Sequence, residues 1–329
     1  MSTNPIRHIA RLLVACATLA CAAGAGAQGS YPNRPVTIII GFSAGGTTDI
    51  IARLISDELR KALGQPIVIE NKPGAGGNIG AEMVAKAKPD GYTLLMGSVG
   101  PLAVNASLYK RMPFDNLKDL TPITLVAHVP NMLVGNPRTV PAQTFQEFVA
   151  LAKANPGKYF YASTGSGTTS HLSGVLLNLQ AGLDLTHVPY KGAVALNDVL
   201  SGESVQCMFA TIPSAIQLVR GGKLRALAVT SLERSGGVPN VPTIAESGFP
   251  GFDASSWFGL VGPAGLPREI ALKIQGEIAR ILKEPVLREK FILQGADPVG
   301  NTPDEFGQYI KDETAKWAKI VKASGAQAD

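Results

Sequence analysis

Cysteine is scarce in this sequence, which excludes a fold held together by disulfide bonds. The 329 residues contain three cysteines, and two of them, Cys16 and Cys21, lie in an N-terminal segment that is typical of a signal peptide. The exported chain would therefore keep Cys207 alone. Cys207 lies within an apolar pattern typical of a strand, and we interpret it as a buried, inert thiol.

Metal-binding and nucleotide-binding patterns are also missing. The histidines beyond the N-terminal segment are His128, His171 and His187, and their spacing does not match a metal site. No P-loop pattern occurs. A near match to a dinucleotide fingerprint at residues 165–170 has Ser170 in place of its third glycine and Lys191 where an acid is expected. We predict neither a metal nor any other cofactor.

Charged residues make up only 17% of the chain, and no run of Lys and Arg with interleaved aromatics occurs. Removing the two arginines of the predicted signal from the 30 basic residues leaves 28 against 25 acidic ones, so the net charge falls from +5 to +3. A nearly balanced charge is poor evidence for binding to nucleic acid. We predict a mixed, solvated surface and no nucleic-acid partner.

No apolar run is long enough to cross a bilayer. The run at residues 12–23 is short, is preceded by two arginines and is followed at residues 25–27 by an A-x-A cleavage pattern. We predict that residues 1–27 are a signal peptide and that the protein is exported to the periplasm. A competing interpretation is lipid attachment at Cys16, but cleavage there would leave the signal with almost no apolar core.

The sequence does contain two glycine-rich turns with the same pattern around them. Residues 36–40 are β-branched and apolar, which predicts a buried parallel strand; residues 41–49 are rich in glycine, serine and threonine, and helical spacing follows. Residues 159–171 repeat this pattern. Glycines let the backbone approach a ligand, side chains such as Thr and Asp suit a helix N-cap, and free N–H groups of a first helical turn attract anions. Two such turns could hold a carboxylate across a cleft.

The order of the remaining elements predicts two α/β lobes. The order βαβαβ between residues 36 and 96 implies a parallel sheet with right-handed crossovers. We expect the chain to pass into a second lobe around residues 123–134 and to return around residues 255–261. The expected lobes are residues 28–127 together with 254–329 for lobe one and residues 128–253 for lobe two.

A serine hydrolase is an alternative function. Residues 41–45 match G-x-S-x-G between a predicted strand and a predicted helix, which would make Ser43 a nucleophile. In that fold an acid and then a histidine follow the nucleophile along the chain, whereas here the last histidine is His187 and 142 residues follow it. We expect no enzymatic activity.

The sequence resembles the Bug-type periplasmic solute receptors of tripartite tricarboxylate transporters, the TctC-like family. The resemblance covers nearly the whole exported chain and lies in residues 44–49 with Ala52 and Arg53, residues 70–78, 89–94 and 190–192, and residues 224–230 with Arg234 and Ser235. It implies a two-lobed periplasmic binding protein of type II, in which each lobe is a mostly parallel sheet flanked by helices and two crossings join the lobes. It also implies capture of a small carboxylate by closure of the lobes and delivery to membrane subunits; we expect a monomer.

The resemblance implies that four turns line the cleft and that backbone N–H groups and hydroxyls hold carboxylate oxygens there, some through water. The candidate ligand-binding residues are Ser43, Ala44, Gly45, Gly46, Thr47, Asp49, Ser98, Gly100, Thr164, Gly165, Ser166, Gly167, Thr168, His171, Tyr190, Lys191, Gly192, Asp198 and Ala210. For His171, donation to a bound anion and a packing or capping role both stay open.

Two departures from the family pattern bear on the ligand. Members commonly carry a Pro-Ala pair before the acid at Asp198, and its absence here predicts a different local wall of the cleft. Many members have Asp where this chain has Ala210, which removes a charge that could hold an amine. We therefore expect a di- or tricarboxylate or an aromatic acid rather than an amino acid. A periplasmic sensor that signals to a membrane kinase is a further alternative.

Overall fold

The computed structural model describes residues 31–192 and 194–328, and these residues form two β-sheets with helices packed on them. The predicted signal peptide and Cys16 lie outside the described residues. None of the helices in the described ranges combines the length and the apolar character needed to cross a bilayer.

The first sheet begins with the predicted βαβαβ unit. Its strands lie in the spatial order β11 (Asp297–Pro298), β4 (Leu120–Val129), β10 (Ser256–Pro263), β3 (Thr93–Ser98), β1 (Val36–Ile40) and β2 (Ile67–Asn71). Strand β1 pairs in parallel with both β2 and β3, so that Ile38 lies opposite Ile69 on one side and Leu94 on the other. The β-branched run is buried at the centre of this sheet, as its apolar pattern predicts.

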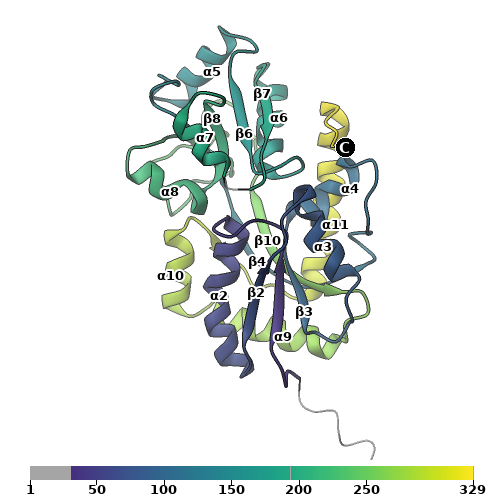
Figure 1. The fold of residues 1–329 in the computed structure, drawn as a ribbon. Coiled ribbons are helices and arrows are strands. Elements are labelled where there is room, and N and C mark those ends of the chain that lie inside the picture. Colours follow the sequence, from purple (N-terminus) through teal and green to yellow (C-terminus); the bar gives the residue numbers. More distant parts are fainter. Residues whose placement is uncertain (1–30, 193, 329) are drawn as a thin grey trace, which may run out of the picture. The chain divides into compact units, whose positions relative to one another are not determined.

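Four of the six strands that the structure describes in the first sheet, β1, β2, β3 and β4, run in one direction, which confirms a mostly parallel sheet. Strand β10 lies between β3 and β4 and runs antiparallel to both, and β11 runs antiparallel to β4. The physical reason is that β4 leaves the first sheet and β10 returns to it, so these neighbouring strands run in opposite directions. Figure 1 shows both strands leading toward the second sheet.

The second sheet has the spatial order β7 (Thr186–Pro189), β6 (Phe160–Ser163), β8 (Cys207–Thr211), β5 (Asn131–Gly135) and β9 (Arg225–Val229). Strands β7, β6 and β8 are parallel, whereas β5 runs antiparallel to β8 and β9. The chain thus enters this sheet after Pro130 and leaves it after Val229. We call each sheet with its helices a lobe, the first lobe one and the second lobe two; the residue boundaries of the lobes stay a prediction.

Helices cover both sheets. Those of lobe one are α2 (Thr47–Leu63), α3 (Asn78–Ala85), α4 (Asn105–Leu108), α9 (Arg268–Ile281), α10 (Pro285–Leu293) and α11 (Pro303–Ser324), with short turns η1 (Ala75–Gly77) and η2 (Gly100–Val104). Those of lobe two are α5 (Phe145–Lys153), α6 (Thr169–Ala181), α7 (Ala195–Ser201) and α8 (Ile212–Arg220). Figure 1 shows α2 and α10 on one side of the first sheet and α3, α4 and α11 on the other.

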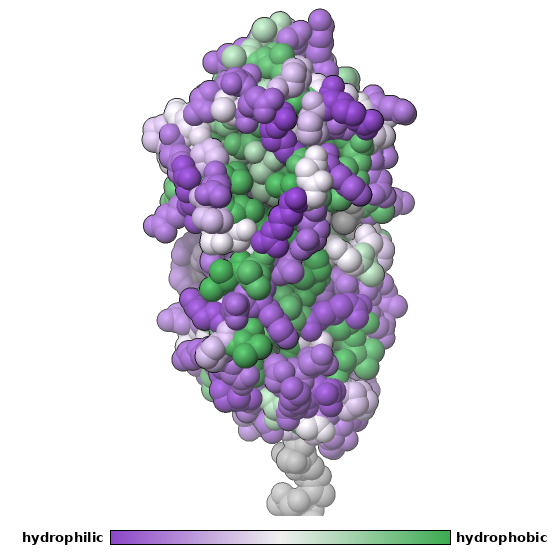
Figure 2. All heavy atoms as spheres, turned by 90° about the vertical axis from the view of Figure 1, so that its left-hand side faces the viewer, coloured by the Kyte–Doolittle hydropathy of each residue, from purple (hydrophilic) through white to green (hydrophobic). Residues whose placement is uncertain are grey.

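Local signals account for the helix ends that matter for packing. Thr302 caps α11 in a capping box with Glu305, and a Thr followed by Glu three residues later is the usual sequence pattern of such a cap. Cys207 is fully buried, which confirms its predicted burial, and burial raises the pKa of its thiol to about 12. On the face that carries α10, Figure 2 shows hydrophilic side chains around smaller hydrophobic patches; Val286 and Leu293 are exposed apolar residues of this helix.

Candidate functional site

A small cavity lies between the two glycine-rich turns. Its volume is about 50 Å³, measured over the positions that the centre of a water molecule can take. Eleven serine and threonine residues line it, Ser43, Thr47, Thr48, Ser98, Thr164, Thr168, Thr169, Ser170, Thr211, Ser214 and Ser256, and the other lining residues are Phe42, Gly46, Val99, Asn131, Gly192 and Phe258. None of these lining residues carries a charge.

The structure places the candidate residues in three locations. At the cavity lie Ser43, Gly46, Thr47, Ser98, Thr164, Thr168 and Gly192. In an adjoining groove, which Ser43, Thr164 and Gly192 also line, lie Gly165, Ser166, Tyr190 and Lys191. Ala44, Gly45, Asp49, Gly100, Gly167, His171, Asp198 and Ala210 line neither space. The side chains of Asp49, His171 and Asp198 lie outside both spaces because each is hydrogen-bonded to another part of the protein.

The first glycine turn, residues 41–49, is held by the carboxylate of Asp49. Asp49 is buried, and its Oδ2 accepts hydrogen bonds from Gly45 N–H at 3.0 Å and from Arg53 Nε at 2.9 Å, while Oδ1 accepts one from Asn71 at 3.2 Å. Burial alone raises the pKa of Asp49, but these hydrogen bonds outweigh it and the pKa is lowered. The N-cap of α2 is Gly46 without a side-chain cap, so the predicted role of Thr or Asp as N-cap is wrong here.

The second glycine turn, residues 163–171, is held by two neutral histidines. His171 Nδ1 accepts the N–H of Gly167 at 3.3 Å, and Ser163 Oγ accepts that of Gly165 at 3.2 Å while it lies 2.6 Å from His187 Nε2. The two imidazoles stack with their centroids 3.9 Å apart. Burial lowers the pKa of His171 to about 4, and burial together with the neighbouring His171 lowers that of His187 to about 3.

The two lobes touch around the cavity. Ser43 Oγ donates to the main-chain oxygen of Lys191 at 3.2 Å, and the hydroxyls of Thr47 on α2 and Thr211 at the end of β8 are in hydrogen-bond contact. Gly167, whose φ is +82°, lies so close to α4 that an added Cβ would overlap Asn105 Oδ1. The structure is therefore that of a closed cleft.

Three helices begin at the cavity wall. Thr47 and Thr48 start α2, and Thr169 and Ser170 start α6; Thr211 is the N-cap residue of α8, without a side-chain cap, and Ser214 lies in its first turn. Free N–H groups and the helix dipole make the ends of α2 and α6 favourable for an anion. In α8 the N–H of Ile212 donates to the main-chain oxygen of Pro130 and Pro213 has no N–H, so this end contributes mainly its dipole. The site can thus attract negative charge although no cationic side chain lines it.

Ser170 is the residue that points most directly to a ligand. Its side chain is 3% exposed and lines the cavity, and its Oγ has no hydrogen-bond partner among the described residues. A buried hydroxyl left unpaired is costly, so an acceptor in the cavity would satisfy it. The predicted ligand-binding residues include its neighbours Thr168 and His171 but not Ser170, although Ser170 lies in the same glycine turn that the resemblance places at the cleft.

Other cavity residues were missed because they come from distant segments. Asn131 follows Pro130 at the start of β5, and Thr211 and Ser214 lie where β8 meets α8. Thr211 is the last residue of β8, and the available signal for it was a polar residue at the end of the apolar pattern around Cys207. No local pattern distinguished Asn131 or Ser214.

Among the described residues, Ser43 makes no hydrogen bond to a histidine or a carboxylate that could act as its base. Its Oγ donates to a backbone oxygen, whereas His171 and His187 hold the second glycine turn and His128 packs edge-on against Tyr309 at 5.5 Å. A nucleophilic serine needs a base within hydrogen-bond reach. This geometry does not favour a hydrolase.

Tyr190 and Asp198 form a pair at the edge of the groove. The hydroxyl of Tyr190 donates to Asp198 Oδ2 at 2.6 Å. Burial and this hydrogen bond raise the pKa of Tyr190 to about 12, so the phenol stays protonated. Asp198 therefore acts in this structure as the partner of Tyr190.

Comparisons with known proteins show which proteins this chain resembles. A family model described as "Tripartite tricarboxylate transporter family receptor" matches residues 51–326. The chain is 39% identical over 326 residues to the protein BugT of Bordetella pertussis, which covers 98% of this chain and 99% of that protein. Among solved structures, a protein of R. palustris with adipate is 36% identical with a TM-score of 0.87 over 91% of this chain and 99% of that one. MatC from Rhodopseudomonas palustris, with bound malate, is 35% identical with a TM-score of 0.82 over 88% of this chain and 100% of that one.

Proposed function

We infer the function of this chain from its family, because it belongs to the tripartite tricarboxylate transporter receptors. We propose that it binds a short aliphatic dicarboxylate in the cavity between its lobes. The observation that carries the proposal is that three helices begin at a cavity lined by eleven serine and threonine residues and by no charged residue.

Electrostatics support an anionic ligand. The N-termini of α2 and α6 offer N–H donors, and all three helix ends offer a partial positive charge, which stabilises a carboxylate without a salt bridge. Ser170 Oγ adds a buried donor that has no partner among the described residues. Two acidic groups suit this arrangement because the helix ends come from both lobes, α2 from lobe one and α6 and α8 from lobe two.

The size of the cavity supports a small aliphatic ligand. At roughly 10–15 Å³ for each water molecule, a cavity of about 50 Å³ holds about three to five waters. Four- to six-carbon diacids replace a comparable row of waters, whereas an aromatic ring needs a wider space. Two relatives were solved with acids of the aliphatic kind, malate and adipate.

The lining also disfavours an amine. Malate and aspartate differ by a hydroxyl in place of an ammonium group, and none of the cavity-lining residues is an acid that could pair with the ammonium. Burying an unpaired charge is unfavourable, so malate should bind and aspartate should bind at least 10-fold more weakly. Ala210 is buried in β8 outside the cavity and offers no charge in its place.

A thermal-shift and calorimetry panel tests the proposal. It should contain malate, succinate, adipate, benzoate, aspartate and the neutral diamide of succinate. A ligand that binds only the folded state adds about 2.7 kcal/mol at one hundred times its Kd. We expect the aliphatic diacids to stabilise the protein and the diamide to have no effect. Stabilisation by aspartate or by the diamide alone would contradict the proposal.

We further propose that the receptor acts in the periplasm as a monomer and delivers its ligand to the membrane subunits of a tripartite tricarboxylate transporter. The family membership supports this partner. Loss of growth on the bound acid after deletion of the gene, and its recovery on complementation, is the expected result. Pull-down of a membrane kinase in place of transporter subunits would favour a sensor.

A further inference from the structure

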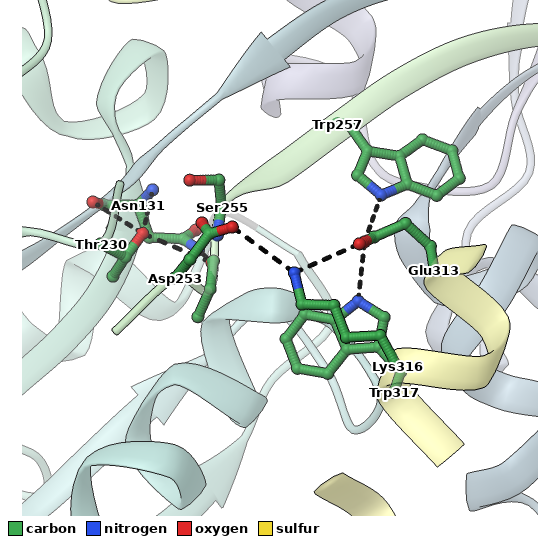
Figure 3. Close-up of polar contacts among 9 residues, drawn as sticks. Asn131, Thr230, Asp253, Ser255, Trp257, Glu313, Lys316 and Trp317 are labelled. Atoms are coloured by element: carbon green, nitrogen blue, oxygen red, sulfur yellow. Dashed lines mark hydrogen bonds and ion pairs between the residues drawn. The ribbon is translucent and has the colours of Figure 1, made fainter. Parts of the chain in front are cut away.

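Asn131 makes hydrogen bonds to the second of the two chain segments that join the lobes while it belongs to the first. The outgoing passage leads from β4 through Pro130 into β5, and the returning passage, residues 230–255, leads from β9 to β10. Asn131 is fully buried and directly follows Pro130, where the chain enters the second sheet. Its main-chain N–H donates to Thr230 Oγ1 at 3.0 Å, and its Nδ2 donates to the main-chain oxygen of Ala254 at 2.9 Å. Thr230 and Ala254 belong to the returning passage, so one residue fastens both passages at the same point (Figure 3).

The same side chain also forms part of the cavity wall. Asn131 lines the cavity, and its Oδ1 accepts a hydrogen bond from Thr169 Oγ1 at 3.5 Å. Thr169 is the first residue of α6 and lies next to Ser170, whose hydroxyl is buried without a partner. Asn131 is thus linked to the ligand side of the cavity and to the returning passage at once.

The lobe-one end of the returning passage is fastened separately, to α11. Asp253 accepts the N–H of Ser255 at 3.2 Å and lies 3.5 Å from Lys316 Nζ, which is 3.2 Å from Glu313. Glu313 Oε2 accepts the indole N–H groups of Trp257 and Trp317, each at 2.9 Å. Figure 3 shows this cluster beside that of Asn131 and Thr230.

We propose that Asn131 couples occupancy of the cavity to the hinge between the lobes, an inference that rests on the proposed receptor function. An opening rotation of the passages separates Asn131 Nδ2 from the oxygen of Ala254 or pulls Asn131 from the α6 N-terminus. A carboxylate held against Thr169, Ser170 and Asn131 therefore has higher affinity for the closed arrangement, which is the condition for a ligand to shift the equilibrium. Asn131 is a positioning residue for closure as well as a wall of the site.

The test measures the distance between the lobes with spin labels at K61C in α2 and K223C in lobe two, both exposed positions. Cys207 is fully buried and does not compete for the label. Distances are recorded without ligand and with saturating malate and adipate. We expect either acid to move the wild type to the closed distance. In Asn131→Ala at least half of the molecules should stay at the open distance under saturation, with affinity lowered about tenfold.

Two control variants separate coupling from simpler roles. Ser98→Ala removes a cavity hydroxyl that makes no hydrogen bond to Asn131, and Asp253→Asn weakens the ion pair with Lys316 at the lobe-one end of the returning passage. Both should still close fully at saturation. Thr169→Val removes the link between the cavity and Asn131 with little change of shape, and it should leave a smaller open fraction, which keeps the test decisive if Asn131→Ala does not fold.

Full closure of Asn131→Ala and Thr169→Val at saturation overturns the coupling, because Asn131 would then be a ligand contact or a structural residue only. A wild type that binds neither acid overturns the receptor proposal instead. In that case the distances measured without ligand decide the role of Asn131. Distances in Asn131→Ala equal to those of the wild type overturn the coupling, and a broader distance distribution than that of the wild type supports it.

Discussion

The first glycine turn is held by a carboxylate and the second by two neutral imidazoles, although both follow the same strand–turn–helix pattern. In the first turn Asp49 accepts the N–H of Gly45, and in the second His171 accepts the N–H of Gly167. Each acceptor lies in the first turn of the following helix, α2 or α6. In each turn a helix side chain thus fixes a backbone N–H group of the turn outside the cavity.

Because one turn is held by a carboxylate and the other by neutral imidazoles, the two turns respond differently to acid. The hydrogen bonds of Asp49 lower its pKa, so its contribution to stability is present above the unfolded value of about 3.8 and is lost only below it. The histidines are buried in neutral form with pKa values of about 4 and about 3. Below pH 6.5 the unfolded chain binds protons that the folded turn does not, so stability falls as the pH falls. Only the second turn is sensitive between about pH 6.5 and 4.5.

The largest expected effect comes from Gly167→Ala in the second turn. An added Cβ overlaps Asn105 of the opposite lobe, so the cleft cannot close as it does here. We expect at least 100-fold weaker binding of malate, which corresponds to about 3 kcal/mol. Gly182→Ala is the matched control, since Gly182 also has positive φ but has no atom within 4 Å of the added Cβ. Gly182→Ala should lower the free energy of unfolding by about 1–2 kcal/mol and leave the affinity for malate, measured by calorimetry, unchanged.

The second effect is the pH dependence of the second turn. Asn can accept the N–H of Gly167 as His171 does but does not titrate. Between pH 7 and 4.5 the free energy of unfolding of the wild type should fall about 2–3 kcal/mol more than that of His171→Asn, because the unfolded histidine binds a proton in this range. Urea unfolding at the two pH values measures this. Equal losses in both proteins would show that His171 is not buried as a neutral group.

The smallest effect concerns the first turn. Asp49→Asn weakens the hydrogen bonds to Gly45 and Arg53, and hydrogen bonds to a charged group contribute about 1.5–3 kcal/mol. We expect the free energy of unfolding of Asp49→Asn to be about 2 kcal/mol below that of the wild type at pH 7. This difference should stay constant between pH 6.5 and 4.5, whereas the difference between the wild type and His171→Asn changes over this range. A loss that grows over this range in urea unfolding would contradict the assignment of charge and neutrality to the two turns.

Much of the fold follows from local signals. The run at Val36–Ile40 predicts β1 to the residue, and the glycine turns lie where the change from strand to helix periodicity places them. The mixed character of the sheets could not be predicted, because β10 pairs between β3 and β4 across more than one hundred residues of intervening chain. Helix α10 was also missed, since its apolar pattern is weak and Val286 is exposed.

The candidate site could be predicted only in part, because local sequence patterns indicate the glycine turns but not the tertiary contacts around them. Residues of the turns, such as Thr47 and Thr168, reach the cavity because the turn itself does. Asp49 and His171 have the right residue type but point to the turn backbone, and sequence alone cannot distinguish these two uses. Asn131 and Ser214 reach the cavity only through tertiary packing of the second sheet.

The most direct test of the account is a crystal structure of the protein grown with malate. We expect malate in the cavity, with one carboxylate within hydrogen-bond distance of Ser170 Oγ and the first N–H groups of α6, and with no Lys or Arg side chain in contact. A cavity that holds only water at saturating malate, or a carboxylate paired with a cationic side chain elsewhere, would contradict it.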